Sequence, residues 1–155
     1  MMVMDTDTHA IDHLAIAEAC TAMGWYADRH QWDQLEALFA EEVLVDYTSL
    51  NGGDPVRSAR ADLVAGWRGT LGGLAATQHM MANPLVTITE DAATCLANFQ
   101  ATHLGSVGGT EVIWTLGGHY RFALARRSDG WRITEIMMSL VWETGSRDVL
   151  AGQEG

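Results

Sequence analysis

The sequence has few basic residues and few cysteines, and it lacks any long apolar run. Nine Lys and Arg residues stand against 20 Asp and Glu residues, so the formal net charge is -11. Such a surface repels phosphate backbones and anionic lipid headgroups. No apolar run approaches the length of a membrane span, and the start of the chain has no basic region followed by an apolar one. We therefore expect a cytoplasmic protein that binds neither nucleic acid nor membrane.

Two cysteines, Cys20 and Cys95, are too few for the disulfide framework of a small secreted domain, and we expect buried free thiols. The composition is 48% hydrophobic and 19% charged, which is typical of a globular protein with a substantial core. A chain of 155 residues buries about two-thirds of its unfolded surface as one domain. We expect a single domain over residues 1–155, with its core at about 10–145 and a tail at 146–155.

Three stretches have apolar residues at helical spacing. The first covers residues 11–30, with Asp12 favourably placed in its first turn. The second is a short stretch around residues 32–42. The third covers residues 58–74, with Ser58 as its expected N-cap.

The remaining elements alternate between apolar and polar residues and are expected to be strands. A short strand is expected at 43–48, and four long ones are expected at 79–89, 93–105, 111–126 and 131–143. Helices thus gather at one end of the chain and strands at the other, which predicts an α+β fold. A curved antiparallel sheet with the long N-terminal helix on its concave side would leave a pocket between sheet and helix.

His79 stands at the start of an apolar segment with no second metal ligand or nucleophile close by in the chain. A lone histidine in that setting is commonly a hydrogen-bonded core residue. Three further polar groups, each in a different element, favour catalysis instead. Asp28 shares a partly apolar helix stripe, where a carboxylate is costly unless paired. His103 continues the apolar face of its strand, and Tyr47 ends the apolar face of another.

Such a set supports acid/base chemistry. A histidine titrates near neutral pH, so it can take a proton from carbon and return one to a leaving group. A carboxylate bonded to the ring fixes its tautomer and favours its charged form. A tyrosine hydroxyl can donate to a carbonyl oxygen that becomes enolate-like.

The segments "YADRHQWDQL", "VLVDY" and "TQH", followed by a histidine ending the next strand, resemble the scytalone dehydratase branch of the nuclear transport factor 2-like superfamily. SnoaL-like cyclases and bile-acid dehydratases also belong to this superfamily. The resemblance spans roughly residues 14–143. It places the family's catalytic aspartate and tyrosine at Asp28 and Tyr47. It places the catalytic histidine at His79 and the histidine that pairs with the aspartate at His103.

The resemblance implies a cone-shaped, curved mixed or antiparallel sheet wrapped by N-terminal helices, a fold also described as cystatin-like. The family's second tyrosine is replaced by Ala27, with Tyr26 one residue further back and turned by about 100 degrees on a helix. His119 and Arg121 stand where the family has small polar substrate contacts, and they either face the pocket or lie on the outer sheet face. The expected substrate-binding residues are Trp25, Tyr26, Phe99, His119 and Arg121.

The function implied is that of a cofactor-independent lyase with no metal, which dehydrates a hydrophobic, carbonyl-activated alcohol of polycyclic, aromatic or steroid-like type. His79 would remove the proton next to the carbonyl and assist departure of water. Asp28, paired with His103, would orient and polarise the reacting groups. Tyr47 would stabilise the enolate. An isomerase or polyketide cyclase with the same pocket is the nearest alternative, and a non-catalytic small-molecule binding module is the second.

Two further patterns concern metals and assembly. His9 and His13 have a spacing that can hold a metal, but the pair lacks the glutamate of a zincin, and a solvated helix start is favoured. A half-open sheet leaves an apolar outer face, which predicts a homotrimer or homodimer. The residues assigned to that face are Trp114, Tyr120, Phe122 and Leu124.

Overall fold

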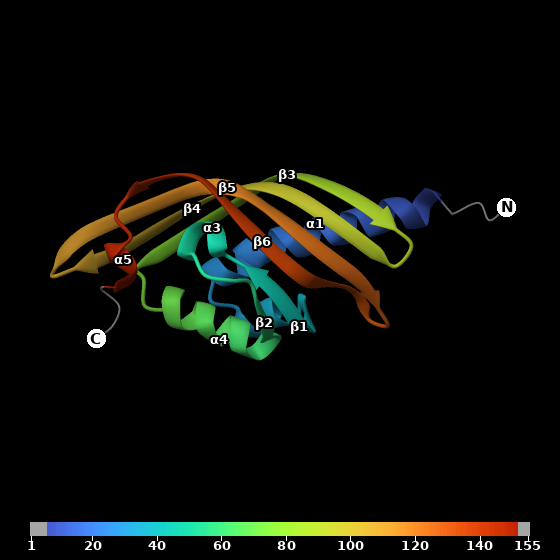
Figure 1. Ribbon diagram of the computed structural model, residues 1–155, viewed down its shortest axis with the longest axis horizontal. Coiled ribbons are helices and arrows are strands. Elements are labelled where there is room, and N and C mark those ends of the chain that lie inside the picture. Colours follow the sequence, from blue (N-terminus) through green and yellow to red (C-terminus); the bar gives the residue numbers. More distant parts are fainter. Residues whose placement is uncertain (1–5, 152–155) are drawn as a thin grey trace.

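A computed structural model describes residues 6–151 of the chain (Figure 1). The helices are α1 (Thr6–Asp28), α2 (Trp32–Glu36), α3 (Thr48–Asn51), α4 (Arg60–Leu71) and α5 (Asp148–Ala151). The strands are β1 (Phe39–Asp46), β2 (Val56–Ala59), β3 (Ala76–Thr89), β4 (Ala92–Val107), β5 (Thr110–Arg127) and β6 (Gly130–Gly145).

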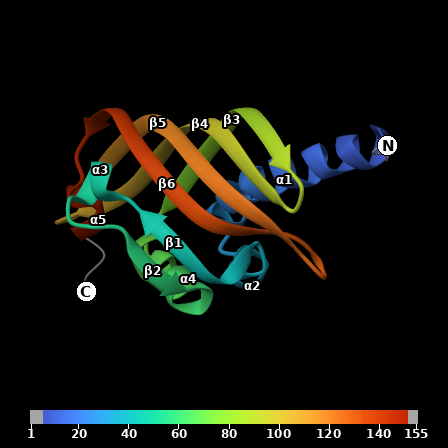
Figure 2. The same ribbon diagram turned by 45° about the vertical axis from the view of Figure 1, so that its right-hand side comes forward.

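All six strands form one mixed sheet in the order β2-β1-β6-β5-β4-β3. β1 and β6 run parallel, and every other neighbouring pair is antiparallel. The sheet is strongly curved, and α1 and α4 lie on its concave side (Figures 1 and 2). The expected α+β fold, a curved sheet wrapped by N-terminal helices, is confirmed.

The concave face of the sheet carries the core. In β4 the odd positions from Ala93 to His103 are buried and most even positions are exposed, as the alternation predicts. α1 packs against this face through Ile16, Cys20 and Met23. Both cysteines are buried and free, as expected.

The pairing of β4 with β5 overturns the expected outer face. Residues directly opposite each other in an antiparallel pair lie on the same side of the sheet. Ala97 pairs with Tyr120 and His103 with Trp114, so the even positions of β5 share the concave side with the odd positions of β4. The four residues assigned to the outer face are therefore buried in the core: Trp114, Tyr120, Phe122 and Leu124.

The first half of the chain contains two further departures from expectation. The second helix ends at Glu36, because residues 39–46 pair with β2 and β6 as a strand. Ser58 is not a helix cap, since it lies in β2 opposite Val43 and its hydroxyl donates to the Ala59 carbonyl. β2 was not predicted because its composition is that of a loop.

At the ends of the described chain, α1 begins at Thr6, so Asp12 lies beyond the first turn. Its carboxylate instead accepts hydrogen bonds from Arg126 and the Trp131 indole, which holds the helix start against β5 and β6. Part of the expected tail 146–155 forms α5, and residues 152–155 lie outside the described residues. Among residues 6–151 no helix is long and apolar enough to cross a membrane.

Candidate active site

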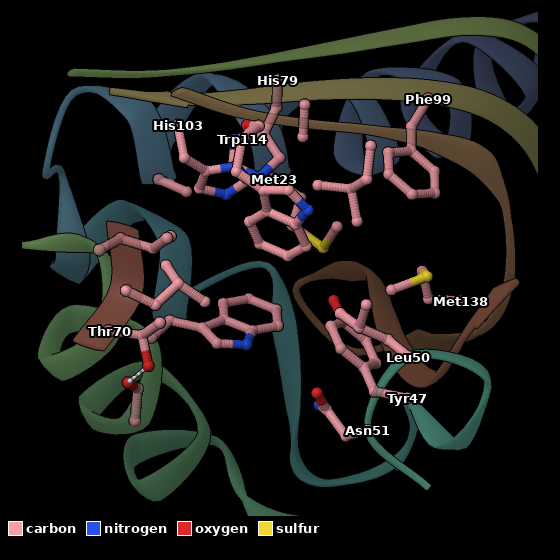
Figure 3. Close-up of a pocket in the computed structure, with 18 of the residues that line it drawn as sticks. Met23, Tyr47, Leu50, Asn51, Thr70, His79, Phe99, His103, Trp114 and Met138 are labelled. Carbon is pink, nitrogen blue, oxygen red and sulfur yellow. Dashed lines mark hydrogen bonds between the residues drawn. The ribbon is translucent and has the colours of Figure 1, made fainter. Parts of the chain in front are cut away.

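A cavity of about 700 Å³ lies between the concave face of the sheet and the helices α1 and α4 (Figure 3). This is a typical size for a small-molecule site. Its lining is mainly apolar and includes Met23, Phe99, Trp114, Leu116 and Met138. The polar side chains of the lining include Tyr47, Asn51, Thr70, His79, His103 and Tyr120.

Asp28 and His79 form a hydrogen-bonded pair at one side of this cavity. His79 Nδ1 lies 2.6 Å from Asp28 Oδ1, and the His79 backbone N–H donates to Asp28 Oδ2 at 2.7 Å. The Thr77 hydroxyl donates to Asp28 Oδ1 at 2.9 Å. Because a carboxylate accepts, His79 Nδ1 carries the proton, which leaves Nε2 of a neutral ring as the basic atom.

The local structure explains why this carboxylate needs three donors. Asp28 is the last residue of α1, where the helix dipole is negative and disfavours a carboxylate. Its side chain is only 9% exposed and that of His79 only 13%, so water provides little compensation. Thr77 and His79 are two residues apart on β3, on the face that meets the helix end. The strand thus supplies the donors that the helix end lacks.

His103 lies next to this pair but is not hydrogen-bonded to Asp28, so the expected Asp28–His103 pairing is wrong. Its ring meets that of His79 edge to face at 5.8 Å between centroids and stacks on Trp114 at 4.8 Å. His103 Nδ1 donates to the Trp114 carbonyl at 3.2 Å, so Nε2 carries a lone pair. Burial and the neighbouring His79 lower the pKa of His103 to about 4, so the ring is neutral at pH 7.

Tyr47 also lines the cavity, and it forms a pair with Tyr120. The two hydroxyl oxygens lie 3.3 Å apart. Tyr47 stands where β1 ends, because the Asp46 carboxylate accepts the Thr48 N–H and turns the chain into α3. Burial raises the pKa of Tyr47 well above its ordinary value and that of Tyr120 to about 12, so both remain protonated. Sequence reasoning missed Tyr120 because the face of β5 depends on its pairing with β4.

Of the five residues expected to contact the substrate, one lines the cavity and the other four do not. Phe99 lines the cavity and packs on Tyr120. Trp25 is 54% exposed, with the Arg29 guanidinium over its ring, because it points away from the sheet. Tyr26 is half-buried against the core without lining the cavity. His119 and Arg121 occupy odd positions of β5, which are exposed on the outer face, and Arg121 lies 4.0 Å from Glu135.

His9 and His13, whose spacing in the sequence could hold a metal, lie on the first turns of α1, outside the cavity. His9 and His13 lie on the exposed surface with their Nε2 atoms 3.2 Å apart. Across residues 6–151, no group of three or more His, Cys, Asp or Glu side chains is arranged to hold a metal ion. The candidate site therefore consists of the Asp28–His79 pair, neutral His103 and the two tyrosines.

Comparison with known proteins identifies the family. The sequence matches the SnoaL-like domain family over residues 8–136. A search of curated protein sequences finds no match to this chain. Among solved structures, Kfla4162 from Kribbella flavida is 26% identical, with a TM-score of 0.82 over 90% of this chain and 95% of that one.

Two more distant structures share the fold. A Novosphingobium aromaticivorans protein provisionally named a scytalone dehydratase is 19% identical, with a TM-score of 0.78 over 92% of this chain and 93% of that one. Hexachlorocyclohexane dehydrochlorinase type 3 from Novosphingobium barchaimii is 14% identical, with a TM-score of 0.72 over 92% and 95% of the two chains. The family match covers most of the chain, so this protein belongs to the SnoaL-like domain family of the nuclear transport factor 2-like superfamily.

Proposed function

We propose that this protein is a cofactor-independent acid/base lyase that removes water from a hydrophobic, carbonyl-activated alcohol. The observation that carries the proposal is the Asp28–His79 pair, whose hydrogen bond of 2.6 Å leaves His79 Nε2 as the basic atom in an apolar cavity. A buried carboxylate bonded to Nδ1 stabilises the imidazolium that forms when Nε2 takes a proton. The pair is thus equipped to remove a proton from carbon near neutral pH.

The elimination requires two proton movements. His79 Nε2 takes the proton from the carbon next to the carbonyl, and the electron pair of that C–H bond moves into the enolate. When the enolate collapses, the C–O bond to the departing hydroxyl breaks, and the proton on His79 goes to that oxygen to give water. His79 is neutral again at the end, so the cycle consumes no cofactor.

The other polar groups have supporting roles in this proposal. His103, neutral and with a lone pair on Nε2, accepts a hydrogen bond from the substrate hydroxyl that will leave. Tyr47 donates to the carbonyl oxygen and stabilises the enolate, which is worth most in a water-poor cavity. The apolar lining favours an aromatic, polycyclic or steroid-like body.

Two solved structures of the same fold support an elimination, since one is provisionally named a dehydratase and another is a dehydrochlorinase. An isomerase or cyclase would use the same first step and differ in where the proton is returned or which bond forms. A binding module would need the cavity without the proton-transfer pair.

The test is turnover of a ring β-hydroxy ketone. The compound 3-hydroxy-1-tetralone loses water and tautomerises to 1-naphthol, whose fluorescence reports the reaction. We expect the wild-type protein to accelerate this reaction and His79→Gln to lose the acceleration. Incorporation of deuterium from deuterated water next to the carbonyl, without loss of water, would show that the first proton transfer occurs without elimination and would favour an isomerase or a cyclase. Absence of both exchange and elimination across a series of ring ketones would reject the enzyme and leave the binding module.

A further inference from the structure

A β-bulge near the end of β6 decides which side of the sheet Glu143 occupies. Val141 is the bulged residue, because its neighbours Leu140 and Trp142 pair with adjacent residues of β5. One extra residue reverses which positions of a strand face the concave side. Beyond the bulge, Glu143 pairs with Leu116, an inward residue of the cavity lining. Glu143 therefore lies on the concave side, whereas plain alternation along β6 would have turned it outward.

Glu143 is the hydrogen-bond acceptor of a tryptophan that lines the cavity. The Trp114 indole Nε1 donates to Glu143 Oε2 at 2.9 Å. The Arg147 guanidinium holds the same carboxylate with two bonds of 2.9 Å, from Nε to Oε2 and from Nη2 to Oε1. The hydrogen bonds from Arg147 and then Trp114 lower the pKa of Glu143, so the carboxylate is ionised at pH 7. Since both charged side chains are partly exposed, the ion pair fixes the position of the acceptor and contributes little to stability.

The Trp114 ring in turn covers one face of His103. The two rings stack with 4.8 Å between their centroids and 30° between their planes, and Figure 3 shows them side by side at the cavity wall. Trp114 is 3% exposed and His103 is 5% exposed. The indole thus keeps water away from the imidazole, and burial is the main cause that holds the pKa of His103 at about 4.

We propose that Glu143, held by Arg147, is a positioning residue that fixes His103 through the Trp114 indole. Without the Glu143 acceptor the buried indole N–H would be unpaired, so the ring would turn or admit water, and either change would disturb the stacking on His103. In the proposed elimination His103 accepts a hydrogen bond from the departing hydroxyl, and a tilted ring would misplace its lone pair. The inference rests on the proposed function for this use of His103, but the contact between the three side chains can be tested without the reaction.

The inference is tested by nuclear magnetic resonance titration of the His103 ring. The protein is labelled with nitrogen-15, and the spectrum of His103→Gln identifies the signal of His103 among the six histidines. In the wild-type protein the ring should remain mostly neutral down to pH 4.5, because its pKa is about 4. Glu143→Leu removes the acceptor, and we expect the pKa of His103 to rise by about 1 or more as water reaches the ring.

The sign of the shift separates a lost contact from a lost charge. Loss of the negative charge of Glu143 would by itself lower the pKa of a nearby histidine, so a rise reports the loss of positioning. Asp28 and His79 are the titratable groups whose charges act on His103, and both are retained in every variant. Glu143→Gln keeps an oxygen that can accept from the indole and should retain the wild-type pKa of His103. Glu135→Leu, which removes a partly exposed glutamate from the same strand, is the matched control and should leave that pKa unchanged.

A double-variant cycle shows whether the effect passes through the indole. Trp114→Phe keeps an aromatic ring but has no N–H, so in that background Glu143→Leu should change the pKa of His103 little. Melting temperatures confirm that each variant is folded, and Glu143→Ala removes the same acceptor if Glu143→Leu does not fold. With 3-hydroxy-1-tetralone as substrate, Glu143→Leu should lower kcat by about 10-fold with a smaller change in KM.

The results that would overturn the inference are distinct from those that would overturn the proposed function. An unchanged or lowered pKa of His103 in Glu143→Leu rejects the positioning role, and so does an equal rise in Glu135→Leu. An undiminished effect of Glu143→Leu in the Trp114→Phe background rejects it too, since the indole would not transmit the effect. A protein that shows the expected titrations but never accelerates elimination retains the contact and loses the lyase assignment.

Discussion

Gly24 of α1 lies against His79 of β3 so closely that a Cβ atom at position 24 would stand 2.9 Å from the His79 Cβ. Asp28 is one helical turn further along the same face of α1. The missing side chain at Gly24 therefore allows the helix to approach the strand, and this approach sets the 2.6 Å contact between Asp28 and His79. A glycine inside a helix destabilises it by about 0.5–1 kcal/mol relative to alanine, so this approach has a cost in stability.

Gly24→Ala should therefore impair the site although alanine favours a helix. The added methyl forces α1 and β3 apart, and a small displacement of a catalytic pair lowers turnover by about 10-fold or more. Overpacking costs about 1–3 kcal/mol and outweighs the gain in helix propensity. Gly66→Ala on α4, where an added Cβ meets no atom within 4 Å, should instead raise the melting temperature. Equal melting temperatures for the two variants would show that Gly24 is not needed for close approach.

His79→Gln should lower turnover by about 100-fold or more while the fold is retained, since positioned acid/base groups contribute that much. Asp28→Asn should have a milder effect, because the geometry survives while the charge that stabilises the imidazolium does not. Turnover and melting temperature are measured together. His119→Gln on the exposed outer face is the matched control and should leave both unchanged. A fully active His79→Gln variant would end the proposed mechanism.

Because of His103, the free energy of unfolding should fall in mild acid. Its pKa falls from 6.5 to about 4 in the folded protein, chiefly through burial, so the unfolded chain binds more protons between these values. Stability therefore rises with pH across this window and is lost as pH falls through it, by up to about 3 kcal/mol. Urea unfolding between pH 4.5 and 7.5 measures the slope. His103→Gln should flatten it, and an unchanged slope would show that His103 is not the group responsible.

Self-association remains a prediction. The residues first assigned to the outer face are buried, so a different set of exposed residues would form the contact. The outer face of the sheet carries a row of cross-strand neighbours formed by Leu85, Leu96, Arg121 and Met137. Leu85 is 67% exposed, Leu96 45% and Met137 38%, a patch that favours contact with a second copy of the chain. Leu96→Glu should dissociate the assembly in light scattering. A wild-type protein that scatters only as a 16.9 kDa monomer would contradict the prediction.

Local patterns predicted the elements well. The helix period of residues 11–30 and the alternation of 93–105 depend on near neighbours and on which face is apolar, and both agree with α1 and β4. The end of the second short helix and the existence of β2 were mispredicted, because strand pairing with β6 and β1 outweighs helix propensity and loop composition there.

The sequence by itself also determined which residue types are available for chemistry, and Asp28, His79, His103 and Tyr47 do lie around one cavity or at its edge. Only the tertiary structure decided their partners. The close approach of α1 at Gly24 assigns Asp28 to His79, and the carbonyl of Trp114 holds His103. The register of β4 with β5 turns Tyr120 inward toward Tyr47. These contacts join residues far apart in the chain, so they depend on packing and register, which no local pattern of apolar and polar residues encodes.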